Sequence, residues 1–225
     1  FFPSGTINTI SVADGECRQD ISYYECSWNG YEGSWEFDNI NALYTVKTIP
    51  ASQAAANLCT LIDPDHGGFL NGNAYWFIVE GTLDLQDSHS SVTCAEGTEV
   101  HLILCDNSSF KTDGFYVNAG STLHIYCQSY GDKMGKLVSE NSRESQPGIG
   151  PEHDGSYAGV IDIHGGDITA KGGQYAAGIG GCEDRSSGTI TIYDGKINSV
   201  GGENGSGIGG GEGGSGTVTK IHGGT

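Results

Sequence analysis

Short runs in which apolar and polar residues alternate recur in the last third of the chain, separated by glycine-rich turns. One unit runs from Ile161 to Gly181, the next from Ile190 to Gly210, and a third begins at Val218. Equivalent isoleucines, such as Ile163 and Ile192, are 29 residues apart. A fixed period of this length predicts stacked β repeats, because one such unit cannot bury its own apolar face.

The same alternation begins earlier, at Ala74, in three segments that predict coils of about 20 to 23 residues. The second and third segments align with each other at a spacing of 22 residues, which pairs Val100 with Thr122. This alignment places His101 opposite Leu123 and leaves the burial of His101 open. It predicts outward positions for Leu104 and Tyr126. The predicted inward residues are Leu83, Leu85, Ile103, Cys105, Leu123, Ile125 and Cys127.

An irregular stretch over 133–153 separates these coils from the glycine-rich repeats. It contains Pro147 and Gly150 in a PGIG sequence that resembles the GIG of the later units, and Ile149 precedes Ile179 by 30 residues. We therefore interpret this stretch as the end of an atypical copy of the repeat.

Residues 1–72 lack the repeat and predict an N-terminal β cap. Strands are expected over Ile21–Trp28, Ser34–Phe37 and Ala42–Ile49, with a hairpin turn at Asn29-Gly30. A short helix with Ser52 as its N-cap is expected over Pro50–Ile62, followed by a loop over Asp63–Asn73. The whole chain is thus predicted to be all-β, a right-handed parallel β-helix over 73–225 that continues beyond the C-terminus, closed at the other end by the cap.

Composition adds a compartment and excludes some partners. The chain has 38 glycines, five prolines and a formal charge of −18. The negative charge argues against binding to nucleic acid or to anionic membranes, and no apolar run is long enough for membrane insertion. The sequence begins FFPSG without Met, so we expect a mature or excised segment of a secreted protein, with its signal peptide and anchor outside this chain.

The seven cysteines have no CxxC spacing, which gives little support for a zinc site. One or two disulfides would suit secretion, and buried thiols that pack as small apolar groups are the alternative. Because the number is odd, at least one thiol stays unpaired within the monomer.

Taken together, these segments resemble a known family. The run from Val100 to Leu137, followed by AGIGG and GTITIYDGKINSVGG units, is similar to the GGT-type, glycine-rich β-solenoid repeats of large bacterial surface proteins, common in gut anaerobes. The resemblance covers Tyr75–Thr225. It implies a β-solenoid fold, a modular secreted or cell-wall-attached protein, and no particular catalytic residues.

Two groups of acidic residues are candidates for calcium. Asp63, Asp65 and His66 form the densest cluster of potential ligands, and we interpret them as an Asx-rich turn, with a cation site as the alternative. The turns at 181–188 and 201–207 also carry carboxylates, but neither has the nine-residue GGxGxDxUx spacing of calcium-binding β-rolls. Calcium therefore remains a possible cofactor, and no metal ligand is assigned.

Catalytic and glycan-binding chemistry is less specific. A carboxylate pair across adjacent coils would suit a polysaccharide-active glycosidase or lyase, and the candidates are Asp162, Asp167, Asp184 and Asp194. No GxSxG, HExxH or Cys/His nucleophile arrangement is present, so no catalytic residue is assigned. Aromatic side chains would provide a sugar-stacking platform if they face outward, whereas Trp35 and Trp76 are expected to close the core at the cap. The platform candidates are Tyr31, Trp35, Tyr75, Trp76, Tyr126 and Tyr157.

The sequence therefore predicts a non-catalytic module of a bacterial surface protein, a stalk or adhesin that contacts glycans or host-surface glycoproteins. The alternatives are a β-helical polysaccharide-active enzyme and a structural spacer without a ligand. The ligand-binding residues remain unassigned.

Overall fold

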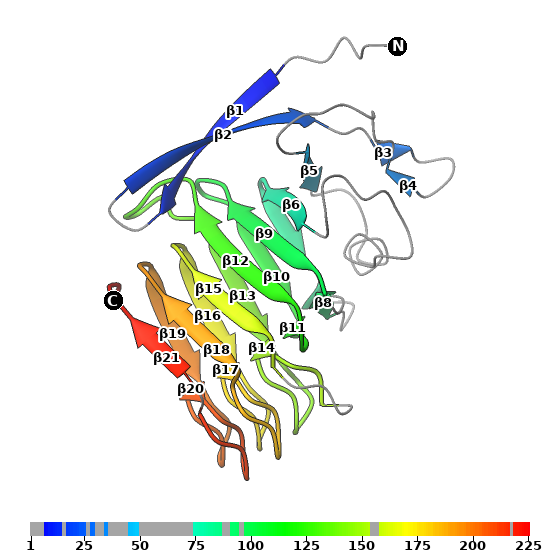
Figure 1. Cartoon of the computed structure of the whole chain (residues 1–225), viewed down its shortest axis with the longest axis vertical. Helices are drawn as coiled ribbons and strands as arrows, with labels where there is room; N and C mark the ends of the chain where they lie inside the picture. Colours follow the sequence, from blue (N-terminus) through cyan, green and yellow to red (C-terminus); the bar gives the residue numbers. More distant parts are fainter. Residues whose placement is uncertain are drawn as a thin grey trace.

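The computed structural model describes residues 7–14, 17–25, 28–29, 34–35, 45–49, 74–86, 91–94, 97–153, 158–216 and 218–225, with side chains from Val79 onward. Every regular element in these ranges is a β-strand. The strands form three long sheets and one small hairpin (Figure 1).

Consecutive coils each contribute one strand to each of the three sheets. The first sheet has nine strands in the order β1 (Ile7–Asp14), β2 (Cys17–Glu25), β5 (Thr45–Ile49), β6 (Ala74–Val79), β9 (Glu99–Leu104), β12 (Thr122–Cys127), β15 (Val160–Ile163), β18 (Thr189–Ile192) and β21 (Val218–Ile221). The second sheet contains β7 (Thr82–Asp84), β10 (Ser109–Thr112), β13 (Lys136–Glu140), β16 (Asp167–Lys171) and β19 (Lys196–Val200). The third contains β8 (Val92–Cys94), β11 (Phe115–Val117), β14 (Ile149–Gly150), β17 (Ile179–Gly180) and β20 (Ile208–Gly209).

From β6 onward, the paired neighbours within these sheets run parallel, which confirms the predicted parallel β-solenoid. The 29-residue period is also confirmed, since Ile163 pairs with Ile192 and Ile179 pairs with Ile208. Ile149 pairs with Ile179, so the irregular stretch does end a copy of the repeat. Because side chains alternate along each strand, one apolar row from every strand points into a single continuous core.

The predicted 22-residue alignment of the central coils is wrong by one residue. Val100 pairs with Leu123 and His101 pairs with His124, a spacing of 23. Since a shift of one residue exchanges the two faces of a strand, Leu102 and Leu104 join the core in place of the predicted Ile103 and Cys105.

The other predicted inward positions can be compared in the same way. Leu83, Leu85, Leu123 and Ile125 belong to the core cluster. Cys127 is buried without belonging to that cluster, and so are Ile103 and Cys105. The outward position of Tyr126 is confirmed by its ring contacts, described below.

The N-terminal part extends the first sheet. β1 and β2 form an antiparallel hairpin, and its tip reaches the end of β12, where Ala13 pairs with Cys127 (Figure 1). β3 (Trp28–Asn29) pairs antiparallel with β4 (Ser34–Trp35), so the predicted hairpin at Asn29-Gly30 is confirmed, whereas β1 was not predicted. The predicted helix over 50–62 lies outside the described residues.

The last described coil leaves part of the core uncovered. The side chain of Ile221 is 63% exposed, although it occupies the same column as the buried Ile163 and Ile192. Ile197, Ile208 and Ile221 line an open hollow of about 450 Å³ at this end. The apolar row that each coil buries is therefore covered by the coil that follows it.

Candidate functional site

Polar and aromatic side chains gather on the outer face of the first sheet. Because the inward row contains Val100 and Leu102, the alternate residues Glu99 and His101 on β9 face outward. The 23-residue register places His124 of β12 beside His101. The next strand places Asp162 beside His124.

Stacked aromatic rings run across this face from coil to coil. Tyr126 stacks on His164 with ring centroids 4.5 Å apart, and His164 stacks on Tyr193 at 4.6 Å. His222 continues the column at 5.4 Å from Tyr193. The interplanar angles are 14°, 10° and 8° along this column. We call these four residues the aromatic ladder; within it the faces of the rings are stacked on each other, so it presents mainly ring edges and polar atoms to solvent.

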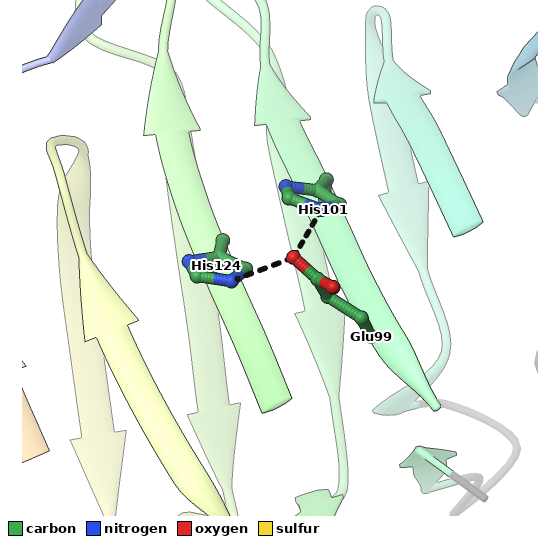
Figure 2. Close-up of side chains that lie close together, drawn as sticks. All are labelled: Glu99, His101 and His124. Carbon is green, nitrogen blue, oxygen red and sulfur yellow. Dashed lines mark ion pairs between the residues drawn. The ribbon is translucent and has the colours of Figure 1, made fainter. Parts of the chain in front are cut away.

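The tightest polar cluster lies beside the ladder, where two histidines point at one carboxylate (Figure 2). Glu99 Oε1 lies 3.0 Å from His101 Nε2 and 3.3 Å from His124 Nε2. One ligand atom from each residue lies within 4.8 Å of the other two. The two imidazole rings are stacked, with centroids 4.6 Å apart and planes 11° apart.

Each histidine also has a polar group near its other ring nitrogen. The hydroxyl of Tyr126 lies 3.3 Å from His101 Nδ1. Asp162 Oδ2 lies 3.5 Å from His124 Nδ1. His124 therefore has a carboxylate on both sides of its ring.

Burial keeps these imidazoles uncharged at neutral pH. It lowers the pKa of His101 from 6.5 to about 3, with His124 and His164 contributing further. Burial also lowers the pKa of His124, although Asp162 and Glu99 act in the opposite direction. Glu99 is the accessible member of the cluster, with its side chain 51% exposed. The arrangement thus offers two neutral nitrogen donors and one solvent-facing carboxylate, a set that suits a borderline transition metal.

The acidic residues predicted as catalytic candidates do not form pairs in the register. Asp162 has His124 and Thr191 as its neighbours in adjacent strands. Asp167 lies between two cations, with its Oδ2 3.7 Å from Lys136 Nζ and 3.6 Å from Lys196 Nζ.

The other two predicted carboxylates lie in turns. Asp194 Oδ1 accepts a hydrogen bond from the backbone N–H of Gly195 at 2.7 Å. Asp184 has a left-handed backbone with φ of 57°, and its N–H donates to the carbonyl of Glu212.

The predicted calcium turns hold their carboxylates in hydrogen bonds within the protein. Glu183 accepts from the hydroxyl of Ser145 at 2.5 Å, and Glu203 accepts from the side-chain amide of Gln174 at 3.3 Å. The cluster of Asp63, Asp65 and His66 lies outside the described residues.

Of the predicted platform aromatics, Tyr126 is placed in the ladder, where it is only 7% exposed. Trp35 lies in β4, and Tyr75 and Trp76 lie in β6, where only the backbone is described. Tyr31 and Tyr157 lie outside the described residues.

The described cysteines are buried thiols without disulfides, namely Cys94, Cys105, Cys127 and Cys182. This agrees with the alternative in which cysteines pack as small apolar groups. The side chains of Cys17, Cys26 and Cys59 lie outside the described part.

The sequence analysis missed the cluster of Glu99, His101 and His124 for an identifiable reason. The signal was a Glu-x-His followed by a second histidine 23 residues later, which is one coil along the stack. The 22-residue alignment set His101 opposite an apolar residue and so separated the two histidines.

Comparisons with known proteins add no relative to this description: no protein-family model, curated protein or solved structure matches the chain. Within the described residues, no helix has the length and apolar character needed to cross a membrane.

Proposed function

We propose that this chain is a non-catalytic module of a secreted or wall-attached bacterial surface protein, in which it acts as a stalk or adhesin. The observation that carries the proposal is the uninterrupted register of three parallel sheets through successive coils. Each coil lengthens such a stack by about 4.8 Å, and its strands hydrogen bond to the neighbouring coils. A rigid body that grows by repetition suits a spacing or presenting role.

The distribution of carboxylates favours this proposal over a polysaccharide-active enzyme. Glycosidases need two carboxyl groups that face one bond. Here Asp167 is held between Lys136 and Lys196, and Asp162 lies beside His124. Both are therefore engaged with basic groups rather than with a second acid.

Contact with glycans would use polar edges rather than open ring faces. In the aromatic ladder the face of each ring lies against its neighbour, so sugar stacking of the kind expected from the sequence has little free ring surface. An open hollow of about 330 Å³ is instead lined by hydrogen-bonding side chains, Gln86, Asp113, Glu140, Asn141, Ser142 and Lys171.

Affinity electrophoresis in native gels tests the proposal. The chain is run through gels that contain mucins or plant and bacterial polysaccharides, with and without calcium. Retardation in selected gels supports an adhesin, and unretarded migration in all of them favours the spacer. Clearing of the polysaccharide along the lane would overturn the non-catalytic proposal.

Two variants locate the contact if retardation is seen. The double substitution Glu140→Ala with Lys171→Ala removes two walls of the polar hollow, and Tyr193→Ala opens the aromatic ladder. Tyr175→Ala is the matched control, because Tyr175 lies in a turn between β16 and β17, which belong to the other two sheets.

A further inference from the structure

We propose that Glu99, His101 and His124 bind one divalent transition metal ion, of which Zn²⁺ is the best match, on the outer face of the first sheet. The ligands are Glu99 Oε1 and the two Nε2 atoms, and at least one coordination position remains open to water or to an external donor. This site goes beyond the proposed stalk or adhesin function and does not depend on it.

The spacing of the ligand atoms is close to that of a bound ion. Zinc is tetrahedral with bonds of about 2.0 to 2.1 Å to nitrogen and about 2.0 to 2.2 Å to oxygen, so its ligand atoms lie about 3.3 Å apart. Glu99 Oε1 lies 3.0 Å and 3.3 Å from the two Nε2 atoms. Little movement of the carboxylate relative to either nitrogen is needed.

The protons around His124 supply an independent reason for an ion. A neutral imidazole carries one proton, yet His124 has Glu99 near Nε2 and Asp162 near Nδ1. If the proton is on Nε2, an unprotonated Nδ1 faces the Asp162 carboxylate, and this buried nitrogen has no hydrogen-bond partner. An ion at Nε2 moves the proton to Nδ1, where it is directed at Asp162.

Both histidines then have the second contact that is usual for metal-bound imidazoles. Such ligands donate their other N–H to a carboxylate or another oxygen, which fixes the ring and makes it a better donor. Asp162 takes this position for His124, and the hydroxyl of Tyr126 takes it for His101. These oxygens come from two coils, so the ion would join the strands β9 and β12 and be supported from β15.

The stacked rings must tilt when the ion binds. Ring planes 11° apart direct their in-plane lone pairs along nearly parallel lines, which do not meet at one point. Each ring therefore has to rotate about its Cβ–Cγ bond, and this rotation alters the contacts of His124 with Tyr126 and His164. The tilt gives the binding event a spectroscopic signature that is separate from affinity.

The donor set distinguishes zinc from calcium. Calcium takes six to eight oxygen ligands, whereas two of the three donors here are imidazole nitrogens. Nitrogen donors suit Zn²⁺, Ni²⁺ and Cu²⁺, and the three donors leave the position that zinc commonly fills with water. Calcium is therefore the negative control ion.

The decisive experiment is calorimetric titration of the untagged, chelator-treated full chain with ZnCl₂. We expect one equivalent of tightly bound zinc and no binding of calcium. His101→Gln and His124→Gln should each weaken binding at least about 100-fold, and Asp162→Asn should weaken it by about 10- to 100-fold. His222→Gln is the matched control, because His222 lies on the same face but contacts Tyr193 in a different coil.

Nitrogen NMR of the histidine rings keeps the proposal testable even if a variant misfolds. In the wild-type chain, zinc should shift the Nε2 signals of His101 and His124 and leave a proton on Nδ1 of each, while His153 is unaffected. The proposal is overturned if zinc fails to bind at one equivalent, if binding survives His124→Gln, or if the shifts appear on other histidines.

Discussion

Gly180 occupies a place where two coils approach more closely than a side chain permits. Its φ is +134°, and a Cβ built there would overlap the carbonyl of Gly209 in the next coil. We expect Gly180→Ala to destabilise the protein by about 3 kcal/mol or more, since backbone strain and overpacking add. Urea unfolding followed by circular dichroism measures the loss. Gly216→Ala is the control, because its nearest atom is 4.0 Å away, and an equal effect of both changes would contradict the explanation.

The buried thiols make a second prediction for single residues. Burial raises the pKa of Cys105 to about 12 and those of Cys127 and Cys182 to about 11, and it raises that of Cys94 as well. Because the reactive form is the thiolate, these four should stay protonated and resist iodoacetamide at pH 8 in the native protein. After denaturation they should be alkylated rapidly. Peptide mass spectrometry resolves each cysteine, and rapid native labelling of any of the four would contradict the prediction.

Among the elements, the strands of the first sheet allow the same substitution to be tested in an interior and a terminal coil. Ile163 is buried, with Ile192 beside it in the register, whereas Ile221 in β21 is mostly exposed. We expect Ile163→Ala to cost about 2 to 5 kcal/mol through lost burial and a cavity. Ile221→Ala should change stability by less than about 0.5 kcal/mol. Urea midpoints of the two variants test this contrast, and similar midpoints would show that position in the stack is unimportant.

The sequence supported strands more reliably where its period was strict. The 29-residue repeat fixed the partners of Ile163 and Ile179 correctly, because identical residues recur in both copies. The coils around His101 share no such identity, and alternating apolar residues fit spacings of 22 and 23 almost equally well. In that region backbone pairing, rather than pattern, determines the register. The cluster of Glu99, His101 and His124 depends on that single residue and was lost with it.

At the scale of the whole molecule, successive coils are close to interchangeable units. Thr189 and Val218 occupy equivalent positions in consecutive coils, so deleting residues 189–217 removes one complete 29-residue coil and joins Gly188 to Val218. Ile221 then takes the place of Ile192 beside Ile163, and the rows of the core keep their order. In a stack with nearest-neighbour interactions, the deletion removes one coil and one interface and leaves the remaining coils unchanged.

We therefore expect the shortened chain to fold with the same β-sheet circular dichroism. It should be about 4.8 Å shorter along its axis by X-ray scattering, with a slightly lower urea midpoint. Zinc binding should be unchanged, because Glu99, His101, His124 and Asp162 all precede the deleted coil. Aggregation, or loss of a cooperative transition, would mean that the last coils are needed to hold the earlier ones together. The stack would then be a single cooperative unit rather than a sum of neighbouring pairs.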